Sequence, residues 1–260
     1  WVFRAFHDCK KLALAMYNLT RFSLSEMTEC GAILRKLGIG AASMEAVANS
    51  IVHHFYNQFL DPETGQSALA LVRFFKTHAY SDLPTDLQPI ATQMLGSTTA
   101  HPGLKCLTLL ATTGDRPEWN ARTASTGHQV IPLPSERMVT QAPMIAQLIQ
   151  QLGLTINNVL APDPDLLVDL QERTYNVFHI PNAINSSYIP AQAEFVAPCK
   201  IQSVLGFGGM LPSGNLMAII LFSKLPIQRD TAELFKPLAL NAKMAILPFS
   251  QGPIFASPSA

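Results

Sequence analysis

The stretch Ser203–Ile227, SVLGFGGMLPSGNLMAIILFSKLPI, constrains the fold more than any other part of this chain. Two apolar runs flank the turn-forming residues PSGN, and Gly206, Gly208 and Gly209 lie inside the first run. A phosphate-binding loop needs its glycines between a strand and a helix N-terminus. Here a second strand-like run follows, and no Gly-Lys-Ser/Thr motif is present. The pattern therefore predicts a β-hairpin, formed by 200–206 and 216–223, in which the glycines make a bulge or bend.

The rest of the chain predicts helices first, then strands mixed with helices. Ser23 with Glu26 forms a capping-box pattern. Pro237 is expected to kink the last helix, and Arg73 is the one charged residue in an otherwise apolar strand. This order is typical of an α+β domain with an antiparallel sheet. The predicted helices span 1–19, 23–38, 43–60, 85–95, 143–152 and 230–246, and the further strands span 67–75, 104–111, 129–134 and 175–180.

The composition limits which kinds of partner the protein is expected to bind. The 260 residues are 48% hydrophobic, enough for a sizeable core, and only 14% charged, which suggests that a second copy or a neighbouring domain covers part of the surface. Basic and acidic residues balance at 18 each, so we expect no nucleic-acid binding. The longest apolar run, 216–222, is far shorter than the roughly 20 residues that span a bilayer, so we expect no membrane insertion. The four cysteines form no CxxC pair, which is typical of free thiols in a reducing cytoplasm.

Several segments resemble a known family. RFSLSEMTECGAILRKLG, ALVRFFKTH, KCLTLLAT, YNVFHIP and the hairpin are similar to GAF-like sensor domains that precede PAS and histidine-kinase modules in bacterial signalling proteins, cyanobacterial ones included. The resemblance covers about residues 21–249. It implies a GAF-like fold with a central antiparallel sheet of about six strands, flanked by helices, and with the N- and C-terminal helices packed together. The expected divisions are an N-terminal signalling or dimerisation helix (1–22), the sensory domain (23–249) and a flexible tail or linker (250–260).

That resemblance also implies a function. We expect a non-catalytic sensory domain that binds a small ligand or a partner and relays the change through its terminal helices to a downstream PAS or kinase module, as a homodimer. Two alternatives stay open: a protein-interaction module without a ligand, and a haem sensor with His179 as axial ligand. No Cys-His dipeptide is present, so no bilin attachment is expected. The sequence identifies neither the ligand nor a cofactor.

Aromatic and polar residues of the irregular central region are the candidates for a ligand pocket. The two thiols of Cys106 and Cys199 are candidate redox groups, because Lys105 and Lys200 adjoin them in the sequence. His53 and His54 are adjacent on a helix and do not form a metal clamp, and no G-x-S-x-G motif is present. A cysteine–histidine nucleophile stays open, since such partners can be distant in sequence. The pocket candidates are Trp119, Arg122, His128, Tyr175, His179 and Tyr188.

Overall fold

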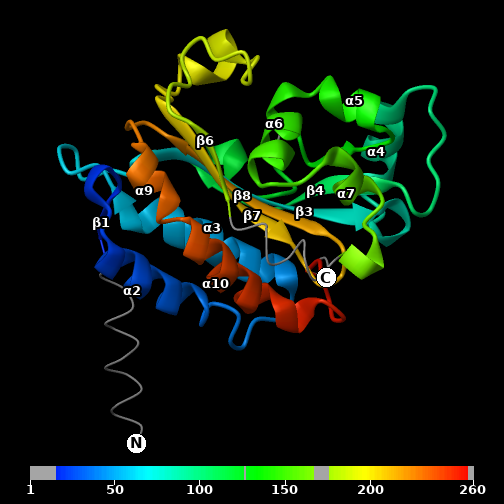
Figure 1. Ribbon diagram of the computed structural model, residues 1–260, viewed down its shortest axis with the longest axis horizontal. Coiled ribbons are helices and arrows are strands. Elements are labelled where there is room, and N and C mark those ends of the chain that lie inside the picture. The colour runs from blue at the N-terminus through cyan, green and yellow to red at the C-terminus, as the bar shows by residue number, and fades with distance from the viewer. Residues whose placement is uncertain (1–15, 126, 167–175, 257–260) are drawn as a thin grey trace, which may run out of the picture.

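The computed structural model describes residues 16–125, 127–166 and 176–256, and its centre is a six-stranded antiparallel sheet (Figure 1). The strand order is β5-β4-β3-β8-β7-β6, so the two central strands, β3 and β8, come from opposite halves of the chain. The expected α+β class, with about six antiparallel strands flanked by helices, is confirmed, and the arrangement is consistent with a GAF-like fold. The strands are β3 (Leu69–Ala79), β4 (Lys105–Gly114), β5 (Val130–Pro132), β6 (Val177–Ile180), β7 (Ser203–Met210) and β8 (Leu216–Ser223).

The predicted hairpin is confirmed, since β7 pairs with β8 along its whole length, from Ser203–Ser223 to Met210–Leu216. Its first strand is 203–210 and not 200–206, and the register runs unbroken through the glycines, so they form no bulge. A Cβ atom built on Gly208 would lie 2.0 Å from the carbonyl oxygen of Met217, so no larger residue fits there without a backbone shift. Gly209 has a φ of 142°, which also favours glycine. The glycine cluster therefore allows two strands to approach closely and forms no phosphate loop.

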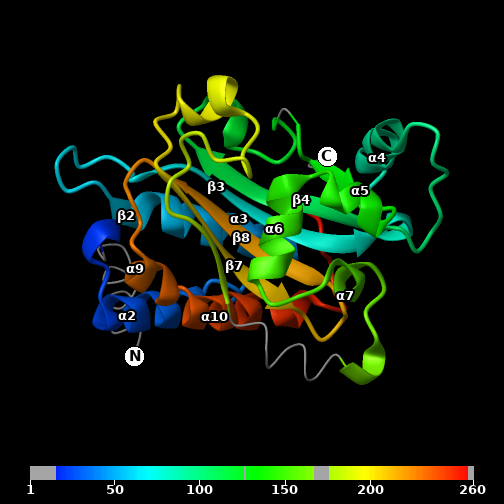
Figure 2. The same cartoon turned by 45° about the horizontal axis from the view of Figure 1, so that its top comes forward.

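One face of the sheet is covered by three long helices (Figure 2). Their apolar residues recur at helical spacing, and the Ser23 capping box at the start of the first is present as the sequence predicts. Phe55, Phe59, Phe207 and Phe235 meet here with no solvent exposure. The result is a dense aromatic core. The three helices are α2 (Leu24–Leu34), α3 (Met44–Gln58) and α10 (Lys236–Ile246).

Short helices and irregular segments cover the opposite face (Figures 1 and 2). Their apolar residues, with Leu71 and Phe75 of β3, form a second core. This face is therefore covered by many short segments, and a cavity lies between them and the sheet. The cover comprises α5 (Glu136–Thr140), α6 (Pro143–Gln151), α7 (Ile156–Leu160), the 3-10 turn η3 (Pro117–Trp119) and the π-helical turn η5 (Gln192–Val196).

Some predicted elements differ from the structure. The predicted helix over 1–19 falls mostly outside the described residues, and its last part is instead the short strand β1 (Tyr17–Asn18) and the turn η1 (Leu19–Arg21). Pro237 kinks no helix. It lies in the first turn of α10, where its missing N–H is not needed, and a separate helix, α9 (Arg229–Glu233), precedes it. The remaining elements are β2 (Phe59–Leu60), α4 (Leu87–Leu95), η2 (Tyr80–Asp82), η4 (Pro164–Leu166) and η6 (Leu247–Phe249).

Candidate functional site

A cavity of about 560 Å³ lies on the sheet face that carries the short helices. Its floor is formed by side chains of the central strands, among them Leu71, Phe75 and Phe222. Ala142–Leu148, at the start of α6, and the segment from Ile189 to Phe195 form its walls. Residues from stretches that are far apart in the sequence therefore line one space.

Aromatic side chains give the cavity a firm wall. The ring of Phe195 makes edge-to-face contacts with Trp119 at 5.7 Å and with Phe222 at 4.9 Å, measured between ring centroids. The guanidinium of Arg116 lies 4.8 Å from the centre of the Trp119 ring, in a cation–π contact. These contacts connect η3 and η5 to β8.

Arg73 brings a charge to this mostly apolar space. It lines the cavity from the middle of β3 and is only 8% exposed. Its Nη2 donates a hydrogen bond to Ser125 Oγ at 3.3 Å, and its buried Nε has no acceptor among the residues that the structure describes. Burial lowers the pKa of Arg73 to about 10, so the guanidinium keeps its charge at neutral pH. His128 also lines the cavity, and its pKa is lowered by burial and by the charge of Arg73.

The structure brings together two of the six predicted pocket residues, Trp119 and His128. Tyr175 falls outside the described residues. Tyr188 is 39% exposed and is not part of the lining, although the next two residues are. The sequence indicates the correct region, but it does not distinguish wall residues from their neighbours.

The other two predicted residues have separate partners. Arg122 is on the opposite side of the sheet, where it forms ion pairs with Glu45 and Asp86, each at 3.2 Å. His179, on β6, places Nε2 at 2.9 Å from the carbonyl oxygen of Ile227. A carbonyl oxygen only accepts, so Nε2 carries the proton, and this nitrogen is engaged within the protein.

Arg73 is a buried, charged cavity residue that the candidate set omits. A signal for it exists in the sequence, because it is a single charge in an apolar strand. Buried charges require partners, so an isolated arginine in a central strand indicates either a buried ion pair or a ligand site.

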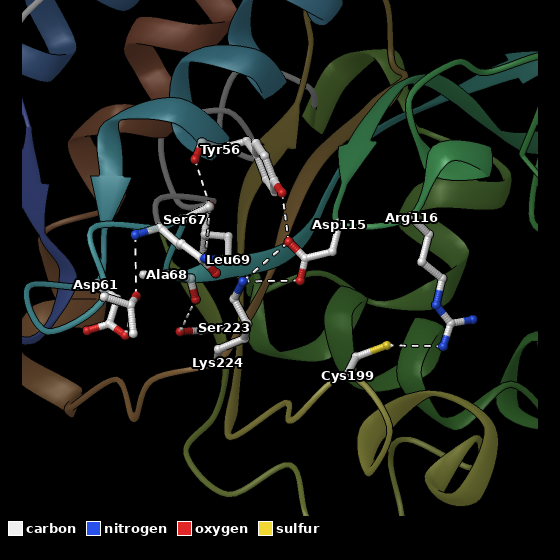
Figure 3. A network of polar contacts seen from close by, with 12 residues as sticks. Tyr56, Asp61, Ser67, Ala68, Leu69, Asp115, Arg116, Cys199, Ser223 and Lys224 are labelled. Carbon is white, nitrogen blue, oxygen red and sulfur yellow. Dashed lines mark hydrogen bonds and ion pairs between the residues drawn. The ribbon is translucent and has the colours of Figure 1, made fainter.

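A polar network lies at the end of the sheet next to the cavity (Figure 3). Tyr56 donates a hydrogen bond to Asp115 Oδ1 at 2.7 Å, and Lys224 Nζ lies 3.1 Å from Asp115 Oδ2. Burial and the bond to the Asp115 carboxylate raise the pKa of Tyr56. These contacts fix the turn after β4, and the next residue, Arg116, therefore reaches the cavity wall.

The two candidate redox thiols lie in different surroundings. Arg116 Nη2 is 3.5 Å from the sulfur of Cys199 (Figure 3), so the positive neighbour is this arginine and not Lys200. Burial nevertheless raises the pKa of Cys199, with Arg116 acting in the opposite direction. Cys106 is fully buried, and burial raises its pKa to about 11. Both groups are therefore neutral thiols at neutral pH.

One cysteine–histidine pair is present, on the densely packed side of the sheet. Cys30 Sγ and His54 Nε2 are 3.5 Å apart, and both side chains are buried. Burial raises the pKa of Cys30 and lowers that of His54 to about 4, so the pair is neutral. Neither residue lines the cavity, which indicates a structural hydrogen bond.

Within the described part of the chain, no group of three or more His, Cys, Asp or Glu residues could hold a metal ion. No helix in that part is long and apolar enough to cross a membrane. The predicted homodimer and the cytoplasmic location stay predictions.

Comparisons with known proteins give a distant structural likeness. No family model matches the chain, and no curated protein matches it. A solved structure of free methionine-R-sulfoxide reductase from Neisseria meningitidis, in complex with its substrate, matches 91% of this chain and 98% of its own length. The sequence identity is 9% and the TM-score is 0.46, so the likeness assigns no activity to this chain.

This finding corrects the functional expectation. The solved structure reported above is that of an enzyme, so the prediction of a non-catalytic sensory or regulatory domain is contradicted. A kinase output module likewise has no support. The chain has a GAF-like α+β fold with a cavity on one face of its sheet.

Proposed function

We propose that the protein binds a small organic molecule with an apolar body in the cavity between the sheet and α6. The observation that carries this proposal is the cavity itself, about 560 Å³ in volume and bounded by apolar and aromatic side chains. Ligand sites typically have volumes of about 300–1,000 Å³ and combine apolar walls with a few polar groups.

The few polar groups of the cavity converge from different elements. Arg73 comes from the floor, while Arg116 and His128 come from loops at the sides. Such a distribution can orient a bound molecule, since each group fixes a different part of it. The aromatic contacts of Phe195 hold the wall in place before any ligand enters.

The proposal is tested with N-phenyl-1-naphthylamine, an uncharged dye that fluoresces in apolar surroundings. We expect a saturable increase in fluorescence with one dye per chain. Ala191 lies on the cavity wall and is exposed, so Ala191→Trp should fill part of the space and weaken dye binding at least about tenfold. Native mass spectrometry of the purified chain would report any molecule already bound.

Ala161→Trp is the matched control, because Ala161 is also exposed but does not line the cavity. The control should bind the dye as the unchanged protein does. Absence of saturable binding, or equal weakening in both variants, would refute the proposal.

A further inference from the structure

We infer that the ligand carries a carboxylate group and that Arg73 binds it. This inference rests on the proposed binding function and adds the chemical class of the molecule. It starts from a contrast between two equally buried arginines, which are 8% and 9% exposed.

Arg122, one of the two, is neutralised within the protein. Its Nε and Nη1 each lie 3.2 Å from a carboxylate oxygen, of Glu45 and Asp86 respectively. This is the usual arrangement, because an unpaired buried charge is strongly destabilising.

Arg73 lacks such a partner. Among the described residues, none of the ion pairs includes it, and no carboxylate contributes to its pKa, which burial alone lowers. Its hydrogen bond goes to a neutral hydroxyl, that of Ser125. Thr112, its cross-strand neighbour on β4, also has a buried hydroxyl without a partner. Among the described residues, two polar groups in adjacent positions are therefore left unsatisfied, and one of them, that of Arg73, lines the cavity.

An entering anion would compensate this charge. The planar guanidinium matches a carboxylate through paired N–H donors, and such charge-assisted bonds are stronger than neutral ones. The other charged groups at the cavity are Arg116 and the exposed Glu194. The described lining thus has a net charge of +1 with His128 neutral, which one carboxylate neutralises and a phosphate dianion would exceed. The apolar walls then hold the rest of the molecule.

Competition against the bound dye tests this inference. We would compare 4-phenylbutyrate with 4-phenylbutanamide, which has the same shape and no charge. The carboxylate should displace the dye from the unchanged protein at a concentration at least about tenfold lower than the amide. This comparison needs no variant, so it does not depend on the folding of one.

Variants then test whether Arg73 causes the preference for the carboxylate over the amide. In Arg73→Met the advantage of the carboxylate should disappear while the dye still binds, and in Arg73→Lys part of it should return. The matched control is Arg137→Met, which removes an exposed arginine that does not line the cavity and should keep the preference. Arg116→Met removes the other cation of the cavity. Loss of the preference in Arg116→Met but not in Arg73→Met would overturn the assignment to Arg73.

The two proposals fail in different ways. Equal displacement by carboxylate and amide, with normal dye binding, would refute the carboxylate inference and leave the binding site intact. A dye that does not bind at all would refute the proposed function itself.

Discussion

The two faces of the sheet are built from the same strands but are covered in opposite ways. On one face, three helices of 11 to 15 residues enclose a core in which the rings of Phe55, Phe207 and Phe235 lie 5.4–6.3 Å apart. On the other face, helices of five to nine residues and irregular turns leave a cavity of about 560 Å³. Long helices pack continuous apolar stripes, whereas short segments meet at many joints.

The difference extends to the buried charges. Arg122, on the densely packed side, pairs with two carboxylates, while none of the described carboxylates pairs with Arg73, on the side with the cavity. We expect the first face to contribute most of the stability, and the proposed ligand site lies on the second. Functional sites commonly contain such locally destabilising groups.

Truncation of one phenylalanine on each face tests this contrast most strongly. Phe55 is fully buried in the aromatic core, so Phe55→Ala should lower the free energy of unfolding by about 4 kcal/mol. Phe195 is partly buried at the edge of the cavity, so Phe195→Ala should lower it by only about 1–2 kcal/mol. Urea unfolding followed by circular dichroism measures both. Equal losses would mean that the two faces contribute alike to stability.

Acidification should lower the free energy of unfolding, because His54 is buried on the densely packed face. Burial lowers the pKa of His54 from its ordinary value of 6.5 to about 4. Between these values the unfolded chain binds a proton that the folded protein does not, so the free energy of unfolding falls as the pH falls. The expected loss from this group is about 3 kcal/mol between pH 6.5 and pH 4.

The variant His54→Gln should lose this part of the pH dependence. Its control is His53→Gln, since His53 is the exposed neighbour on the same helix and should leave the dependence intact. Urea titrations at several pH values provide the measurement. An unchanged pH profile in His54→Gln would show that His54 is not responsible.

Arg73→Met should have the smallest effect and the opposite sign. Removing a buried charge that has no carboxylate partner should raise the free energy of unfolding by about 1 kcal/mol. The comparison variant Arg122→Met should lower it, because it leaves the buried Glu45 carboxylate without its cation. Thermal unfolding of both proteins measures the pair. A clear destabilisation by Arg73→Met would mean that the protein itself compensates this charge.

Much of the architecture follows from local signals in the sequence. The turn residues PSGN and the apolar runs beside them predict the β7–β8 hairpin, and the Ser23 capping box predicts the start of α2. Pro237 shows the limit of such signals, since proline is compatible both with a kink and with a helix start. The packing of α10 against the sheet and α2 favours the second of these, with Pro237 at the start of the helix.

The walls of the cavity could not be predicted from the sequence, because only the tertiary structure brings them together. Periodicity, caps and turns fixed the α+β class and the order of the elements, because each acts over a few residues. Arg122 and Glu45 are 77 residues apart in the sequence, and His179 and Ile227 are 48 apart, so no local signal predicts these contacts. Only the folded chain decided that Arg122 meets two carboxylates while Arg73 meets none among the described residues, because burial and charge pairing are properties of the assembled layers.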